Sequence, residues 1–96
     1  MNVGDIVSLV TLSGEYVGQI TDLNTTSVSL KDPRMILQSQ DGQMGFAKGI
    51  AVTGEENPKE VEFRNIVFMT PSNEGIQNAW KDATGQIITP SSNIVV

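Results

Sequence analysis

The stretch Ser13–Pro33, "SGEYVGQITDLNTTSVSLKDP", constrains the fold more than any other part of this chain. It contains two glycines, a polar tip at residues 24–26, and a run at residues 27–31 in which polar and apolar residues alternate. Such alternation is typical of a strand with one buried face, and Asn and Thr are common in turns. The pattern therefore predicts a β-hairpin with strands at 16–23 and 27–31. Gly18, inside the first strand, predicts a bulge, a sharp bend or a close approach of another backbone.

Other short segments also have the pattern of strands separated by tight turns. A run rich in β-branched residues predicts a strand at 5–12 whose two faces are both partly apolar. Pro33 has no N–H group to donate, and we expect it to interrupt the hydrogen-bond ladder after the second strand of the hairpin. The remaining β segments that we predict are a hairpin over 34–46 that turns at Asp41-Gly42, a short strand at 49–52, and strands at 60–63 and 66–70.

The hydrophobic periodicity changes after residue 70. Apolar residues recur at i, i+4 and i+7 from Ile76, which predicts a helix over 73–84 with one apolar face. Ser72 is the predicted N-cap of this helix, and Gly85 is its predicted C′ residue. The tail at 86–96 is apolar near both of its ends and is either a docked strand or a frayed terminus.

Composition narrows the classes of function. The chain has no cysteine and no histidine, which excludes a disulfide framework and a thiol nucleophile and removes the commonest general base and metal ligand. We therefore predict no enzymatic activity, no metal and no cofactor. The net charge of −5 counts against an extended basic surface for nucleic acid. The N-terminus lacks the pattern of a signal peptide, and no apolar run approaches the ~20 residues that span a bilayer, so we expect a cytoplasmic protein without membrane association.

These segments together predict one mainly β domain over residues 1–96. Five short strands joined by tight corners are typical of a small, strongly bent antiparallel barrel, which we place at about 3–70. The helix at about 73–84 is appended to the barrel, and the tail at 86–96 ends the domain.

The strand segments carry a resemblance to a known family. The residues concerned are Gly4, Val7, Leu9, Leu12, Gly14, Gly18, Ile20, Leu23, Val28 and Leu30. In this order they resemble the first signature block of the Sm-like proteins, including the bacterial Hfq type. The run "VEFRNIVFM" (Val61–Met69) resembles the second block. The resemblance covers roughly residues 3–32 and 60–70, and it implies an Sm-like, SH3-type barrel of five strands.

Three positions depart from the family's pattern. The turn from Gly14 to Gly18 is one residue shorter than the usual spacing. Asn24 stands where the family has a loop aspartate, and Arg64-Asn65 stands where the family has an Arg-Gly pair. The usual N-terminal helix also has no room before a first strand that begins near Val3. We interpret the chain as a divergent branch of the family, of phage or viral origin and acting in the host cytoplasm.

The resemblance implies a site for single-stranded RNA. In Sm-like rings, the tips of the second-to-third strand loop and of the fourth-to-fifth strand corner face the central pore. By position, the corresponding residues here are Asn24, Thr25, Thr26, Arg64 and Asn65. An Asn side chain can hydrogen-bond a base edge, and an Arg side chain can pair with phosphate or stack on a base. The alternative is a structural or adaptor ring that binds protein, in which the same residues only form turns.

The strand at 66–70 predicts self-association. Both of its faces are apolar, and it has none of the charges, prolines or bulges that protect edge strands in soluble monomers. Pairing with the fourth strand of a neighbouring copy would satisfy this edge, and a head-to-tail contact can close into a ring. The resemblance implies five to seven copies, and we favour five or six. The predicted interface residues are Val61, Phe63, Ile66, Val67, Phe68 and Met69.

Two further features each have two interpretations. Trp80 is either a stacking platform for a base or partner, or the side chain that packs the helix against the barrel, and we favour packing. Asp41 and the Glu55-Glu56 pair are either acid–base or metal groups, or solvated turn residues. We favour the second interpretation because the sequence offers no third ligand and no activated nucleophile.

Overall fold

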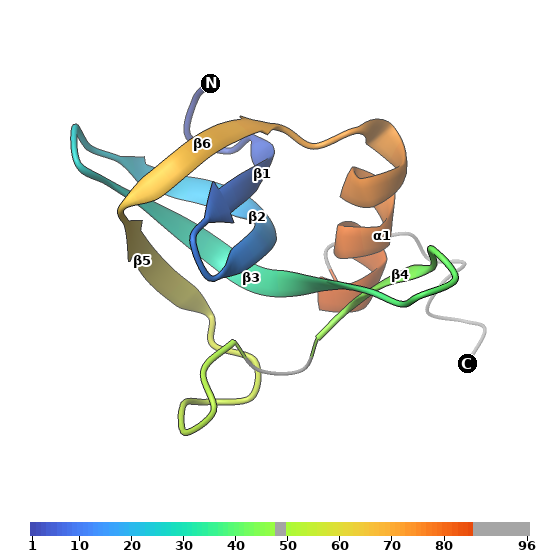
Figure 1. The fold of residues 1–96 in the computed structure, drawn as a ribbon. Helices are drawn as coiled ribbons and strands as arrows, with labels where there is room; N and C mark the ends of the chain where they lie inside the picture. Colours follow the sequence, from blue (N-terminus) through green and yellow to red (C-terminus); the bar gives the residue numbers. More distant parts are fainter. Residues whose placement is uncertain (48–49, 86–96) are drawn as a thin grey trace.

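The computed structural model describes residues 1–47 and 50–85, and within them the chain is mostly β with one short C-terminal helix (Figure 1). The elements are β1 (Ile6–Thr11), β2 (Gly14–Leu23), β3 (Ser27–Gln38), β4 (Met44–Phe46), β5 (Glu60–Arg64), β6 (Ile66–Pro71) and α1 (Glu74–Thr84). The predicted class, a β sheet followed by a helix, is confirmed. The described residues form six strands rather than five, because the predicted hairpin over 34–46 contributes the end of β3 and the separate strand β4.

All strand pairs are antiparallel, and one edge of β3 is shared by two strands. The path of the sheet runs β4-β3-β2-β1-β6, and β5 also pairs with β3. β5 lies along Ser27–Lys31, whereas β4 lies along Ile36–Gln38. The path from β5 through β3, β2 and β1 therefore ends at β6, and the strands at its two ends are joined through Asn65 alone. This arrangement is compatible with a small β-barrel.

The long strand β3 bends at Asp32 and Pro33. Asp32 has a φ of 48°, and the register between β2 and β3 shifts between Val17 and Gln19, opposite this bend. A proline is tolerated at a bulge because the N–H that it lacks is not required there by the ladder. The expectation that Pro33 interrupts the ladder is confirmed, because neither Asp32 nor Pro33 has a register partner on β2, β4 or β5. The strand itself continues beyond Pro33 to Gln38.

Gly18 lies on β2 at this register shift and is buried. A Cβ atom at Gly18 would lie 3.0 Å from Leu30 Cβ and 3.1 Å from the backbone oxygen of Lys31. The prediction of a bulge with a close backbone approach is confirmed. The absence of a side chain lets the two strands cross closely where the sheet bends.

Two hydrophobic clusters lie on opposite faces of β1 and β2. The first contains Val7, Leu9, Ile20, Val28 and Leu30, with Phe63, Ile66 and Met69 packed against it. The second contains Ile6, Val17 and Trp80, with Ile36, Phe46 and Ile76 packed against it. Successive residues of a strand point to opposite faces, so Ile6 enters one cluster and Val7 the other. The predicted burial of both faces of the first strand is confirmed, and α1 covers the second face (Figure 1).

The helix begins one residue later than the sequence predicts. Asn73, not Ser72, is the N-cap, and its side chain accepts a hydrogen bond of 2.9 Å from the N–H of Ile76. Ser72 is buried and makes a 2.7 Å hydrogen bond with the hydroxyl of Ser8 on β1. The predicted role of Gly85 is confirmed, because Gly85 has a φ of 74° and its N–H donates to the end of the helix.

Two other expectations concern the rest of the chain. The prediction of a strand at 49–52 is wrong for residues 50–52, which form bends and a turn. Residue 49 and the tail at 86–96, with its docked or frayed alternatives, lie outside the described residues. In the part of the chain that the structure describes, no helix is both long and apolar enough to cross a bilayer.

Candidate functional site

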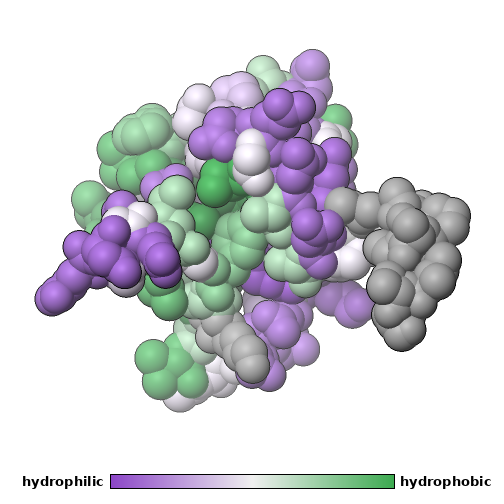
Figure 2. Space-filling model, turned by 90° about the vertical axis from the view of Figure 1, so that its right-hand side faces the viewer, coloured by the Kyte–Doolittle hydropathy of each residue, from purple (hydrophilic) through white to green (hydrophobic). Residues whose placement is uncertain are grey.

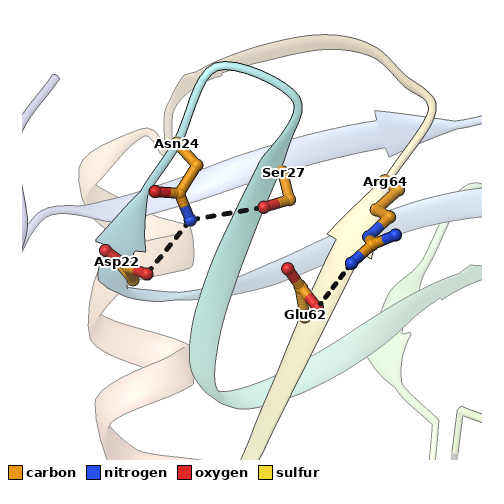
Figure 3. Close-up of polar contacts among 5 residues, drawn as sticks. All are labelled: Asp22, Asn24, Ser27, Glu62 and Arg64. Atoms are coloured by element: carbon orange, nitrogen blue, oxygen red, sulfur yellow. Dashed lines mark hydrogen bonds and ion pairs between the residues drawn. The ribbon is translucent and has the colours of Figure 1, made fainter.

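The first predicted tip is the loop between β2 and β3. The N–H of Asn24 donates to the carbonyl of Ser27 at 2.9 Å, which closes the loop. The Asn24 amide group also donates to the carboxylate of Asp22 at 3.1 Å and contacts the Ser27 hydroxyl at 3.4 Å (Figure 3). Thr25 and Thr26 are exposed at the end of the loop. The loop is therefore held by its own hydrogen bonds, and its tip is open to solvent.

The second predicted tip is the corner between β5 and β6. Asn65 has a φ of 57°, a left-handed conformation that Asn tolerates better than most residues. This single residue forms the corner between β5 and β6. Arg64 precedes it, has a side chain 69% exposed, and forms an ion pair of 3.4 Å with Glu62 on the same strand. Asn65 thus has a structural role at the corner, whereas Arg64 carries the charge.

The sheet brings these two tips together. Ser27, at the start of β3, is the register partner of Arg64, at the end of β5. The loop that carries Asn24 therefore lies beside the corner that carries Arg64, although Asn24 and Arg64 are 40 positions apart in the sequence. Figure 3 shows both side chains at the same end of the β3–β5 pair. All five predicted site residues belong to this pair of tips.

Two acidic side chains that contact the site, Asp22 and Glu62, were not predicted from the sequence. Asp22 lies two residues before Asn24, and Glu62 lies two residues before Arg64. Side chains at i and i+2 of an extended segment point to the same side of the backbone, and this spacing was the available signal. Two of the five candidate RNA-contacting side chains, those of Asn24 and Arg64, thus already contact a carboxylate two residues earlier in the chain.

The chemistry of the site follows from these contacts. An ionised carboxylate only accepts hydrogen bonds, so Asp22 directs the amide nitrogen of Asn24 toward itself. The amide oxygen is then the atom that can accept from the N–H of a base. An exposed ion pair contributes about 0–1 kcal/mol, so Arg64 can exchange Glu62 for a phosphate at little energetic cost. The Asn24 amide and the Arg64 guanidinium can both bind a nucleotide. The neighbouring carboxylates of Asp22 and Glu62 repel its phosphate group and weaken that binding.

The predicted interface residues divide into an inner and an outer set. Phe63, Ile66 and Met69 pack against the first hydrophobic cluster, and Val61 is half-buried opposite Leu30. Val67 and Phe68 are each 56% exposed on β6. Among the described residues, β6 pairs only with β1 and β5 only with β3, so each presents one edge without a strand. The expectation that the strand at 66–70 has no bulge is wrong, because its register with β1 shifts at Val67. The outer set and these two edges are the surfaces that a neighbouring copy could cover.

Trp80 is a packing residue. It is 1% exposed within the second cluster, and its indole N–H donates to the carbonyl of Asp32 at 2.8 Å. This bond fastens α1 to the bend of β3. The stacking-platform interpretation does not fit a side chain this deeply buried.

The other acidic residues singled out in the sequence, Asp41, Glu55 and Glu56, lie in turns and loops outside the two tips. Asp41, in the turn between β3 and β4, accepts hydrogen bonds from the Ser39 hydroxyl and the Gln43 N–H, and these bonds lower the pKa of its carboxyl group. Glu55 and Glu56 are exposed. Within residues 1–47 and 50–85, no three acidic side chains come together as a metal site would require.

The two neighbouring tips are thus the site that the geometry assembles. Their loops are closed by hydrogen bonds, their exposed side chains are polar, and both contain an acidic partner. Neither a protein-family model nor a curated protein matches this sequence.

Proposed function

We propose that this protein is a subunit of an Sm-like ring that binds single-stranded RNA where the β2–β3 loop meets the β5–β6 corner. The observation that carries the proposal is the pairing of Ser27 with Arg64, which places the two tips side by side. In the five-strand numbering of the Sm-like fold, these tips are the second-to-third loop and the fourth-to-fifth corner. β4 is then an addition to the barrel beside the second half of β3.

The RNA would be held by few contacts per subunit. Asn24 supplies an amide that reads a base edge, and Arg64 supplies the one cation of the two tips, which pairs with phosphate. A single subunit with so few contacts binds weakly. A ring of five or six copies multiplies these contacts around one pore, which raises the overall affinity by avidity.

The ring itself is supported by the two strand edges. β5 and β6 each have an edge without a strand among the described residues, and Val67 and Phe68 are exposed beside one of them. Pairing of β5 from one copy with β6 from the next satisfies both edges and buries apolar surface. Because the contact joins different edges, it is head-to-tail and closes into a cyclic ring.

A second function, a structural or adaptor ring that binds protein, is favoured by the charge of the site. The carboxylates of Asp22 and Glu62 accept hydrogen bonds from the side chains of Asn24 and Arg64. The net charge of the chain is −5. Carboxylates beside a phosphate path weaken binding to RNA by electrostatic repulsion. In this function the tip residues form turns only, and the assembled surface binds another protein.

The assembly is tested by light scattering coupled to gel filtration. A mass of five or six chains of 10.3 kDa supports the ring, and a mass of one chain at micromolar concentration overturns it. Phe68→Asp should dissociate the ring, because it places a charge beside the pairing edge. Leu37→Asp is the matched control, since Leu37 is similarly exposed on β3 but lies on neither of the two edges.

The RNA site is tested by fluorescence anisotropy with oligo-U and oligo-A over a series of salt concentrations. Arg64→Ala should weaken binding to both oligomers and reduce the salt slope by about one unit per bound subunit. Asn24→Ala should change the preference between oligomers more than the slope. Lys81→Ala, on α1 and away from the tips, is the control cation.

Two outcomes separate the candidate functions. A ring that binds neither oligomer at low salt, and that purifies with the absorbance ratio of pure protein, is an adaptor ring. Binding that neither Arg64→Ala nor Asn24→Ala alters removes these residues from the site.

A further inference from the structure

An apolar groove of about 440 Å³ lies between β4 and α1. Its principal lining residues are Ile36, Met44, Phe46, Ile76, Ala79 and Ala83. Figure 2 shows this side of the molecule, where hydrophobic surface lies between hydrophilic flanks. The groove is on the helix side of the protein, formed by other elements than the loop and corner tips.

The walls of the groove are apolar but exposed. Met44 is 57% exposed on β4, and Ala79 and Ala83 are exposed on α1. On a helix, residues three and four apart share a face, so both alanines extend the apolar face that Trp80 and Ile76 bury against the sheet. The sheet thus covers only part of the apolar face of α1. Among the described residues, nothing covers the part that contains Ala79 and Ala83.

The groove also borders a strand edge. β4 is the last strand of the sheet path, and among the described residues no strand pairs with its other side. The segment Met44–Phe46 has no charge and no proline, the features with which proteins commonly protect such edges. A segment in the groove could therefore gain both apolar contacts and backbone hydrogen bonds to β4.

The chain itself provides a segment with this chemistry. Residues 86–96 contain five β-branched apolar residues, Ile87, Ile88, Ile94, Val95 and Val96, and no charged residue. β-branched residues favour extended strands. Asp82 contributes a carboxylate to the groove, which opposes an acidic occupant but not an uncharged one.

The tail also starts at the groove. α1 ends at Thr84, and Ala83 in its last turn is part of the groove wall. Gly85 adopts the left-handed conformation that commonly reverses the chain at the end of a helix. At roughly 3.3 Å per residue, an extended tail reaches about 35 Å, which is about twice the length of this helix at ~1.5 Å per residue.

We propose that the tail at 86–96 binds in the β4–α1 groove of its own subunit and adds to the edge of β4. Attachment to Gly85 makes this an intramolecular contact with an effective concentration in the millimolar range, which favours the chain's own tail over a free peptide. The inference concerns a surface separate from the RNA tips, and it holds whether or not RNA is bound.

The test uses the full chain labelled with ¹³C at its methionine methyl groups, together with a soluble paramagnetic agent. Without the tail in the groove, Met44 would be as accessible as Met1, since they are 57% and 49% exposed. We expect the Met44 signal to be broadened at most half as strongly as that of Met1. The double variant Ile87→Asp/Ile88→Asp should shift the Met44 signal and make it as accessible as Met1, while the Met69 signal stays unchanged.

A second variant tests the groove from the other side. Ala83→Glu should expose Met44 as the tail variant does, because it adds a charge to the apolar wall. Asn78→Glu is the matched control, since Asn78 is an exposed residue of the same helix that does not line the groove. Unchanged circular dichroism in both variants shows that the helix remains folded.

Two results would overturn the proposal. Equal broadening of Met44 and Met1 in the unaltered chain means that the groove is open. The second result comes from refolding labelled Ile87→Asp/Ile88→Asp chains with excess unlabelled wild-type chains. If Met44 of the labelled chains regains protection, the tail crosses to a neighbouring copy.

Discussion

Gly18→Val tests whether the close crossing of β2 and β3 depends on the absence of a side chain. A Cβ atom at this position would meet Leu30 Cβ at 3.0 Å, the Lys31 carbonyl oxygen at 3.1 Å and Leu30 Cδ1 at 3.2 Å. Such distances are shorter than ordinary van der Waals contacts. Two of these neighbours are a backbone atom and a Cβ atom, which cannot move away by a change of rotamer.

The magnitude follows from overpacking. Added carbon atoms in a packed core typically cost 1–3 kcal/mol, so we expect Gly18→Ala to lose about 2 kcal/mol of unfolding free energy. Valine adds two methyl groups beside Leu30, and we expect a loss of about 3 kcal/mol or more. In a domain of this size each kcal/mol lowers the melting temperature by roughly 4–8 °C, so Gly18→Val should melt at least ~12 °C lower.

Thermal unfolding followed by circular dichroism, at one fixed protein concentration, measures this effect. Gly45→Ala is the matched control, because Gly45 is also a strand glycine, but a Cβ atom there would meet nothing within 4 Å. It should leave the stability unchanged or raise it slightly through the unfolded state. A Gly18→Val protein that melts at the wild-type temperature would refute the reasoning about the crossing.

Asn73→Ala should cost about 1 kcal/mol in urea unfolding because it removes the N-cap of α1, and Asn73→Ser should restore most of this loss. Trp80→Phe should lower the free energy of unfolding measured in urea by about 2 kcal/mol, because it removes the hydrogen bond to the Asp32 carbonyl and leaves a cavity. The pKa of Asp41 is lowered chiefly by the Ser39 hydroxyl, so Ser39→Ala should raise it in an NMR titration. The pKa of Asp41 is lower in the folded state than in the unfolded state, so the ionised carboxylate stabilises the fold. This contribution to stability is present above the unfolded-state pKa and is lost as the pH falls through the folded-state pKa. A titration curve for Asp41 that Ser39→Ala does not move would contradict this assignment.

The sequence predicted the elements that depend on local patterns. Alternation identified the strands at 27–31 and 60–63, and the change of period identified α1. Gly18 and Gly85 were interpreted correctly because each occupies a backbone position that other residues fill only with strain or a clash. These signals are local, so one sequence suffices to recognise them.

The errors have long-range causes. Ser72 and Asn73 are both good N-cap residues, and only the contact with Ser8 on a distant strand removes Ser72 from that role. Pro33 interrupts the ladder as expected, but the continuation of β3 beyond it depends on pairing with β2 and β4, which the local pattern does not reveal. The apolar residues at 50–52 have a strand-like composition, but no described strand pairs with them.

The candidate site was predictable in part. The loop at 24–26 and the corner at 64–65 follow from turn chemistry, and the register of β3 with β5 places them together. The acidic contacts of Asn24 and Arg64 depend on rotamers that sequence alone does not determine. These contacts are the reason that two functions, rather than one, are proposed for the same two tips.

The pairing of β1 with β6 also has a consequence for the order of folding. Ser8 and Ser72 are 64 residues apart, whereas β1, β2 and β3 follow one another directly. Contacts between distant segments form late because closing a long loop costs entropy first. During synthesis at roughly 5–20 residues per second, β6 emerges about 3–13 s after β1. For that interval the nascent chain carries a β1 edge that only a chaperone or another nascent chain can cover.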